Sequence, residues 1–248
     1  MVGLAAAVIK DEERLGRDSV RTGAGAGWHE HHHDLFHGTE RLFKPGYVPN
    51  LVGSSIPALD GVEAKLLAGA SVADVGCGHG ASTILMAQAY PNSTFVGFDY
   101  HAESIAVARK RAAEAGVADR ARFETAAAAG IPRHRLRPRL HLRRPARHGR
   151  PGRGRRPHPP GTGARRHAPR GRAHGRREPD REHQRGGPLF YSVGLFICLA
   201  HAKSQGGAQQ LRPQVAESTW RRLFAEAGYR RFRRATETPF NRVFEARV

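Results

Sequence analysis

Three glycines at alternate positions, Gly76, Gly78 and Gly80, have a spacing that could serve ligand binding. They follow the apolar run Val72–Val75 and precede a helix-forming stretch that begins at Ala81. Glycine lets a backbone turn sharply and approach a ligand without a Cβ in the way, and a helix N-terminus offers unpaired N–H groups. The sequence therefore predicts a binding loop at the carboxyl end of a buried strand, where open parallel sheets hold their ligands.

Two acidic residues help to choose between the ligands that such a loop could hold. Asp74 lies just before the first glycine, and Asp99 ends the next expected strand, where it can accept hydrogen bonds from ribose hydroxyls. A nucleotide P-loop needs Gly-Lys-Ser/Thr, which this loop lacks. A dinucleotide fingerprint with Ala81 in its third position stays open, and it would make the chain an NAD-dependent oxidoreductase. The carboxylate of Asp74 disfavours a pyrophosphate and suits a cationic ligand.

The stretch DVGCGHG resembles the first motif of class I S-adenosylmethionine-dependent methyltransferases, in which an acidic residue precedes three alternating glycines. The acidic residue at the end of that family's second strand falls on Asp99, and the position after it falls on Tyr100. The resemblance implies S-adenosyl-L-methionine as the cofactor. It also implies that Asp99 holds the ribose of the cofactor and that the adenine packs on Tyr100. The residues assigned to cofactor binding are Asp74, Gly76, Cys77, Gly78, Gly80, Asp99 and Tyr100.

The resemblance covers 71–125 and extends to 189–248, whose end, LFAEAGYRRFRRATETPFNRVFEARV, looks like the last helix and hairpin of the family. The stretch WHEHHHDLFHGTERLF is similar to the lead-in helix of a small-molecule methyltransferase branch. These likenesses imply an enzyme that methylates a small-molecule acceptor. Related enzymes often carry an upstream dimerisation domain, which this chain starts too late to contain, and a homodimer is the protein partner to consider.

An alternation of strand and helix patterns surrounds the loop. We expect strands at Val72–Val75, Thr94–Phe98 and Ala121–Glu124, separated by helices at Ala81–Tyr90 and Ala102–Ala115. This spacing is typical of an α/β fold with a parallel sheet and crossover helices. The resemblance implies a Rossmann-like class I methyltransferase sheet in the family order 3-2-1-4-5-7-6, with the central strands 4 and 5 missing or disordered in this chain.

The segments on either side of this alternation differ in composition. We expect a helix containing Val62–Leu67, turns at Pro45-Gly46 and Pro49-Asn50, a helix around Val215–Ala227 and two strands joined near Pro239. The expected division is a weakly ordered lead-in at 1–27, a helical lead-in over the substrate side at 28–70, the N-terminal half of the cofactor-binding domain at 71–132, an aberrant disordered segment at 133–187, and the C-terminal half of the same domain at 188–248.

A histidine cluster, HEHHHD, is the second candidate for chemistry. His29, Glu30 and His33 match the H-E-x-x-H zinc motif, whose histidines lie one helical turn apart. The cluster follows a Gly-rich segment and offers no evident third ligand beyond His37, so we expect no metal site, and a solvated helix end is the simplest interpretation. Because a neutral imidazole can take a proton from an acceptor hydroxyl or amine, His33 and His37 are the candidates for a catalytic base.

The positive charge of the chain is concentrated in one segment. Residues 133–187 contain nineteen Arg, no Lys and three acidic residues, and so carry +16 of the formal net charge of +19. Such a segment could bind nucleic acid non-specifically through its charge, and a basic nucleic-acid-binding protein built on an inactive methyltransferase core is the alternative function. The absence of Phe, Tyr and Trp from the segment argues against it, because bases would have nothing to stack on.

The composition of this segment matches a G+C-rich coding sequence in the wrong frame. Shifting the frame of RHRLRPRLHLR by one base permits GTGYDLVFTFD, a turn and a hydrophobic strand ending in Asp, as the resembled family carries at its fourth strand. We therefore interpret the segment as frameshifted from about Pro132 to about Gly187, and expect weak or absent activity from the literal chain.

Two further features bear on the cellular setting. Cys77 and Cys198 provide neither a disulfide framework nor paired-Cys metal spacing, which fits a reducing compartment. The N-terminus lacks the pattern of a signal peptide, and the longest apolar run, Leu189–Ala200, is shorter than the ~20 residues of a membrane helix. We expect a cytoplasmic protein without a membrane partner.

Overall fold

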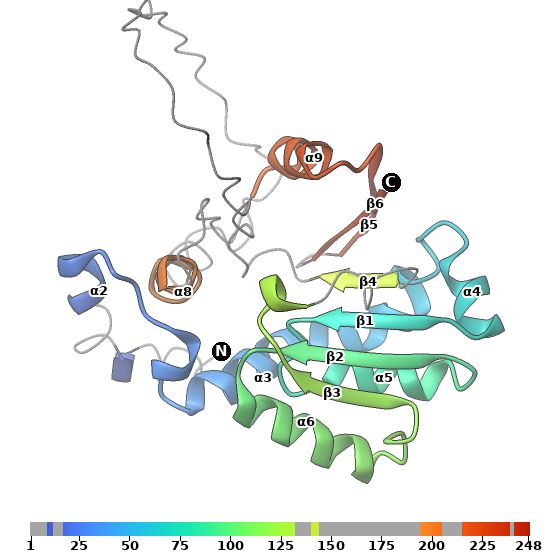
Figure 1. The fold of residues 1–248 in the computed structure, drawn as a ribbon, viewed down its shortest axis with the longest axis horizontal. Coiled ribbons are helices and arrows are strands. Elements are labelled where there is room, and N and C mark those ends of the chain that lie inside the picture. The colour runs from blue at the N-terminus through green and yellow to red at the C-terminus, as the bar shows by residue number, and fades with distance from the viewer. Residues whose placement is uncertain (1–8, 12–16, 132–139, 144–193, 205–214, 239–240) are drawn as a thin grey trace, which may run out of the picture.

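A four-stranded parallel sheet forms the centre of the computed structural model, which describes residues 9–11, 17–131, 140–143, 194–204, 215–238 and 241–248 (Figure 1). The sheet has the order β3-β2-β1-β4, from the strands β1 (Ser71–Val75), β2 (Thr94–Asp99), β3 (Ala121–Thr125) and β4 (Leu140–Arg143). The helices α5 (Ala81–Ala89) and α6 (Ala102–Glu114) connect β1 to β2 and β2 to β3. The three strands and two helices predicted around the glycine loop are thereby confirmed.

Both faces of the sheet are buried around β1, as is typical of parallel sheets with crossover helices. On one face Val72 and Phe95 belong to a core shared with α5 and α6. On the other face Ala73 and Phe98 pack with Ile131, which follows the 3₁₀ turn η4 (Ala128–Gly130). This double burial explains why β1 and β2 are nearly continuous apolar runs in the sequence.

The two crossover helices begin and end where the local sequence favours it. Gly80 precedes α5 with a φ of 76°, and α5 ends just before Pro91, because the residue before a proline avoids helical conformation. The imidazole of His101 accepts a hydrogen bond from the backbone N–H of Ser104 at the start of α6. Gly116, with a φ of 67°, follows its end.

The fourth position of the sheet differs from the expectation of a missing strand. The four residues of β4 pair in parallel with β1, from Val72 opposite Leu140 to Val75 opposite Arg143. A ladder needs backbone N–H and C=O groups rather than apolar side chains, so an arginine-rich stretch can add a short strand. The expected fifth strand, and the expected disorder of 133–187 apart from 140–143, lie outside the described residues.

The lead-in is more continuously helical than predicted, since turns were expected at Pro45-Gly46 and Pro49-Asn50. The helix α3 (Asp34–Asn50) runs through both prolines and continues as the π-helical η3 (Leu51–Ser55). Pro45 and Pro49 lie four positions apart, and both are exposed. They therefore share the solvent face of the helix, where water can bond the carbonyls that prolines leave unpaired. The prediction of turns was wrong for this reason.

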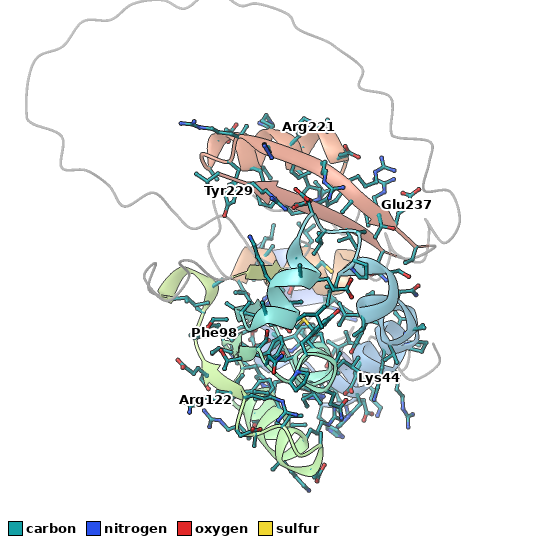
Figure 2. All side chains as sticks on the ribbon, turned by 90° about the vertical axis from the view of Figure 1, so that its right-hand side faces the viewer. Lys44, Phe98, Arg122, Arg221, Tyr229 and Glu237 are labelled. Carbon is teal, nitrogen blue, oxygen red and sulfur yellow. The ribbon has the colours of Figure 1, made fainter. Side chains whose placement is uncertain are left out.

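The C-terminal helix and hairpin form a unit of their own, made of α9 (Glu217–Glu226), β5 (Arg231–Glu237) and β6 (Arg242–Arg247). The two strands pair antiparallel, as predicted, and make a separate two-stranded sheet instead of extending the parallel one. Figure 2 shows this unit, with Arg221 and Glu237, at one end of the molecule and the sheet with Phe98 at the other. The guanidinium of Arg233 donates to the carbonyl of Ala58 over 2.8 Å, which attaches β5 to the lead-in.

The remaining helices and helical turns lie around the sheet. The elements are α2 (Arg17–Thr22), the 3₁₀ turn η2 (Trp28–Glu30), α4 (Val62–Ala68), the π-helical η8 (Leu195–Leu199) and α8 (Ala200–Ser204). In Figure 1 the strands of the parallel sheet point toward the side on which α2 and α8 lie, which is the side where such sheets bind ligands. None of the helices in the described ranges is long and apolar enough to cross a bilayer.

Candidate functional site

The loop between β1 and α5 has the sharp backbone that its three glycines predicted. Gly76, Gly78 and Gly80 all have positive φ, at 80°, 55° and 76°. The N–H groups of Gly76 and Cys77 both donate to the carbonyl of Phe98, over 2.7 and 3.1 Å, so the loop starts by bending across the end of β2. L-residues with a side chain rarely adopt this left-handed conformation, so glycine is required at these positions.

The carboxylate of Asp99 connects the end of β2 to the middle of this loop. Its Oδ2 accepts a hydrogen bond of 2.9 Å from the N–H of Gly78, and its Oδ1 accepts one of 3.0 Å from the N–H of His101. Two residues that the sequence predicted as cofactor ligands are thus brought together. The carboxylate is only partly buried, and an ionised carboxylate has about four acceptor sites. It therefore retains capacity for further donors.

The second and third glycines face different surroundings. A Cβ added to Gly78 would meet no atom within 4 Å, whereas one added to Gly80 would lie 2.7 Å from the Phe123 ring and 2.9 Å from Cβ of Ala108. Gly80 is therefore also a packing residue, which lets α5 lie close to β3 and α6. Gly78 borders open space, so a ligand can approach the loop backbone at this residue.

Asp74 supports the loop through hydrogen bonds to the first turn of α5. Its Oδ2 accepts hydrogen bonds from the hydroxyls of Ser82 and Thr83, both at 2.8 Å. The carboxyl is buried, and Thr83 is fully buried. Charge-assisted bonds of this kind are stronger than neutral ones, so they hold the first turn of α5 against the end of β1. The arrangement gives Asp74 a clear role in positioning the loop.

Cys77 is the loop residue that points into the core. Its thiol is buried among the residues that pack between the sheet and its helices, and a Cβ on Gly97 would lie 2.9 Å from its Sγ. The thiol makes a weak hydrogen bond of 3.7 Å to the carbonyl of Gly78. The Cys77 side chain therefore supports the loop from the sheet side.

Tyr100, the residue assigned to adenine packing, lies against α8. Its ring stacks on the imidazole of His201, with centroids 5.5 Å apart and planes inclined by 21°. Its hydroxyl accepts a hydrogen bond of 2.8 Å from the N–H of Trp28. Burial raises the pKa of the phenol, against the opposing effect of this hydrogen bond. The contact between adenine and Tyr100 stays a prediction. One face of the Tyr100 ring is already covered by the imidazole of His201.

A polar cluster joins the glycine loop to the lead-in helix α3. Nδ1 of His79 lies 3.0 Å from Oε2 of Glu40, whose Oε1 accepts a hydrogen bond of 2.6 Å from Arg111. Burial lowers the pKa of His79, against the raising effect of the carboxylate. Burial acts to raise the pKa of Glu40, but the hydrogen bonds and the charges of Arg111 and His79 together outweigh it, so this pKa is lowered as well. The ring of His37 lies 5.4 Å from that of His79.

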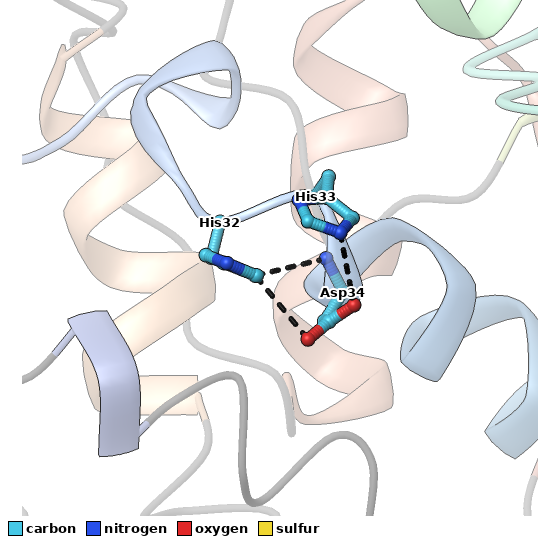
Figure 3. A group of neighbouring side chains, drawn as sticks. All are labelled: His32, His33 and Asp34. Atoms are coloured by element: carbon cyan, nitrogen blue, oxygen red, sulfur yellow. Dashed lines mark hydrogen bonds and ion pairs between the residues drawn. The ribbon is translucent and has the colours of Figure 1, made fainter.

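The H-E-x-x-H stretch does not take the geometry of a zinc-binding helix. Its first residues form a 3₁₀ turn, and α3 begins only at Asp34. Figure 3 shows the neighbours that do gather there: Nε2 of His33 lies 3.2 Å from Oδ1 of Asp34, and Nδ1 of His32 lies 3.4 Å from Oδ2. The His33 side chain is 72% exposed, so the first candidate base lies in solvent. The second, His37, is exposed but lies beside the loop.

Sequence reasoning missed several of these partners. Glu40 and His79 are separated by 39 positions, and Tyr100 and His201 by 101, so no local pattern relates them. It also missed His31, which is buried with its Nδ1 at 3.0 Å from the carboxylate of Asp11. The Nε2 atom of this imidazole has no hydrogen-bond partner among the described residues.

The loop geometry agrees with a comparison of the sequence to known families. Residues 66–138 match a family described as a methyltransferase domain. Over these residues the chain is similar to a methyltransferase domain. The matched range of the domain contains β1, β2 and β3, the glycine loop and Asp99, so it holds every residue predicted to bind the cofactor. No curated protein matches the chain.

Three solved structures illustrate the extent of the similarity. YjhP from E. coli is 33% identical over 25% of each chain, with a TM-score of 0.24. A SAM-dependent methyltransferase from Geobacter sulfurreducens in complex with S-adenosyl-L-homocysteine is 34% identical over 25% of this chain and 24% of its own, with a TM-score of 0.23. An RNA methyltransferase from Salinibacter ruber, in complex with the same compound, is 33% identical over 23% of this chain and 37% of its own, with a TM-score of 0.22. The match thus spans between 24% and 37% of the length of these structures.

Proposed function

We propose that this chain is an S-adenosylmethionine-dependent methyltransferase that acts on a small molecule. The observation that carries the proposal is the hydrogen bond between Asp99 and the N–H of Gly78, which holds a carboxylate beside an open glycine loop at the carboxyl ends of parallel strands. The methyltransferase-domain match over 66–138 supports the same conclusion. Relatives crystallised with S-adenosyl-L-homocysteine fit it too.

The residues present fit the cofactor at two points. The open space beside Gly78 gives a ligand access to the loop backbone. Asp99 uses its two carboxylate oxygens for two N–H donors and has acceptor sites left for ribose hydroxyls. When bound, S-adenosylmethionine supplies a methyl group on a positively charged sulfur, which suits a loop that lies between the carboxylates of Asp74 and Asp99 and contains no Lys or Arg.

The contribution of the protein residues is binding and orientation, which for a transfer of this kind accounts for much of the rate. Asp74 fixes the loop through Ser82 and Thr83, and Asp99 fixes the middle of the loop. His37 is the better placed of the two predicted bases, because it lies beside the loop residue His79. A base of this type would accept the proton of an acceptor hydroxyl or amine.

We also propose that methyl transfer by the literal chain is impaired. From Arg144 to Gly187 the sequence contains no Val, Ile, Leu, Met, Phe, Tyr or Trp, so it lacks the side chains with which a fifth strand and its helices would complete a core. Sequencing the DNA for 125–190 tests the frameshift interpretation. A shifted frame that encodes a Val/Phe-rich strand supports it, and a shifted frame full of stop codons overturns it.

Calorimetric titration of the full chain with S-adenosylhomocysteine tests the cofactor assignment. Gly78→Ala should weaken binding by ~10-fold or more, because the added Cβ and the changed backbone occupy the open side of the loop. Gly116→Ala is the matched control, since Gly116 also has a positive φ and open space but lies at the end of α6. Equal affinity of both variants would overturn the assignment. Binding of NADH in place of S-adenosylhomocysteine would favour the oxidoreductase alternative.

A further inference from the structure

Three side chains with metal-ligating atoms meet where α3 contacts the glycine loop. His37, Glu40 and His79 each offer one ligand atom, and these atoms all lie within 4.8 Å of one another. Two of the three come from successive turns of α3, and the third comes from the loop between β1 and α5. The fold therefore brings together two imidazoles and a carboxylate from segments about 40 residues apart in the sequence.

The cluster has the features of a constructed site rather than of a solvated surface. The side chains of His79 and Glu40 are only 9% and 15% exposed. Arg111 donates to Oε1 of Glu40 over 2.6 Å and so orients the carboxylate, with its other oxygen, Oε2, directed at the imidazole. Partners of this kind, which orient a ligand from outside, are typical of metal sites in proteins. The exposed His37 leaves one side accessible to water.

We propose that His37, Glu40 and His79 bind a divalent transition-metal ion, with Zn²⁺ and Co²⁺ as the best-suited ions. Imidazole nitrogen and carboxylate oxygen are ligands that these ions prefer, and three protein ligands with one water complete a tetrahedron. Metal–ligand bonds of about 2.0–2.2 Å require ligand atoms roughly 3.4 Å apart. His79 and Glu40 are at 3.0 Å and the ligand atom of His37 lies within 4.8 Å of both, so binding requires shifts of about an ångström, and His37 is exposed and free of the core.

The neighbouring group of His32, His33 and Asp34 also brings three ligand atoms together but is less suited. Nδ1 of His32 accepts a hydrogen bond of 3.2 Å from the N–H of Asp34, which occupies its lone pair. Lys10 lies 2.7 Å from Oδ2 of Asp34, the oxygen that faces His32. At Glu40, by contrast, the cation and the imidazole bond different oxygens of the carboxylate.

An ion at this place would link the lead-in helix to the cofactor loop. It would replace the hydrogen bond between His79 and Glu40 with bonds to both residues and to His37. The proposal goes beyond methyl transfer and depends only on the geometry of α3 and the loop. In a chain that holds the ion, His37 is a metal ligand and no longer a proton acceptor. Since the ion binds the folded chain, it should also raise the unfolding temperature, with an increase that grows with the logarithm of its concentration once the ion is in excess of its dissociation constant.

Titration of the untagged full-length chain with Co²⁺, followed by visible absorption and by calorimetry, tests this proposal. We expect one ion per chain with the intense visible bands of tetrahedral cobalt. His37→Ala and Glu40→Gln should each weaken metal binding by ~10-fold or more. Removal of a residue that only orients a ligand already costs about that much affinity, and removal of a ligand should cost at least as much. His33→Ala is the matched control and should leave the affinity unchanged, because His33 belongs to the neighbouring group.

Three results would overturn the proposal. They are the absence of Co²⁺ and Zn²⁺ binding, binding that His33→Ala abolishes and His37→Ala does not, and octahedral spectra typical of ions on surface histidines. Far-ultraviolet circular dichroism of each variant separates loss of binding from loss of folding. The affinity for S-adenosylhomocysteine, measured in parallel, separates this proposal from the cofactor assignment, since either can fail alone.

Discussion

Oδ2 of Asp99 accepts a hydrogen bond of 2.9 Å from the backbone N–H of Gly78, while Oδ1 accepts another from the N–H of His101. One carboxylate therefore joins the glycine loop to the start of α6. Because both donors are backbone N–H groups, the acceptor must have two hydrogen-bonding oxygens and no donor of its own. An ionised aspartate meets this requirement, and an asparagine does not.

Asp99→Asn should therefore destabilise the loop, because the amide group would face one of the two N–H donors and leave it unsatisfied. We expect a loss of roughly 1–3 kcal/mol in the free energy of unfolding, measured by urea denaturation. Binding of S-adenosylhomocysteine should weaken by ~10-fold or more, measured by calorimetry. Asp119→Asn is the control, because the Asp119 side chain is 72% exposed. An Asp99→Asn chain with unchanged affinity would argue against a ribose contact.

Gly80→Ala tests the packing role of the third glycine. The new Cβ would lie 2.7 Å from the Phe123 ring and 2.9 Å from Cβ of Ala108, at a φ of 76°. We expect a loss of about 2–4 kcal/mol in unfolding free energy, from the left-handed backbone and the overpacking together. Gly116→Ala, with the same backbone strain and open space, should lose only about 1–2 kcal/mol. If Phe123→Leu in the Gly80→Ala chain restores no stability, the overpacking explanation is wrong.

Thr83→Val tests the support of the loop by Asp74. The hydroxyl of Thr83 is fully buried and donates to the carboxylate over 2.8 Å, and valine keeps the shape but not the donor. We expect a loss of roughly 1.5–3 kcal/mol in unfolding free energy, as for a hydrogen bond to a charged group. Thr94→Val removes an exposed hydroxyl that lies 3.1 Å from that of Ser71, and it should change stability by less than about 0.5 kcal/mol. Equal effects of the two substitutions would contradict the assigned role.

The sequence predicted the half of the sheet around the glycine loop because each signal there is local. The apolar run before Gly76, the stop at Pro91 and the glycine at position 116 each act within one element. The loop and Asp99 could be assigned to one site for a related reason. Parallel strands that follow each other along the chain end at the same edge of a sheet.

The errors came from properties that neighbouring residues do not determine. Pro45 and Pro49 interrupt no helix because both lie on an exposed face, and exposure depends on packing. The strand at Leu140–Arg143 was not expected, because it lies within an arginine-rich segment whose composition gives no sign of a backbone that pairs with β1. The contacts of Glu40 with His79 and of Tyr100 with His201 require the arrangement of α3 and α8 around the sheet.

The acid dependence of stability should report on the junction between α9 and the hairpin. Glu217 accepts hydrogen bonds from Arg234 at 2.9 Å and Arg221 at 3.0 Å. The hydrogen bond from Arg234 is the main cause that lowers the pKa of Glu217 below its ordinary value of 4.5, and burial opposes it. The charge of Arg234 and the hydrogen bond and charge of Arg221 lower the pKa further. A group with a lowered folded-state pKa contributes stability that is complete above its unfolded-state value and is lost as the pH falls through the folded-state value.

Glu217→Gln should therefore be less stable than the parent chain above about pH 5, and this difference should shrink as the pH is lowered toward about 3. Urea midpoints measured across this range by circular dichroism check the expectation. Arg234→Gln is the matched variant, because removal of the cation takes away the main cause of the shift and should also reduce the pH dependence. A Glu217→Gln chain that loses stability on acidification as steeply as the parent would show that the junction pair contributes nothing to it.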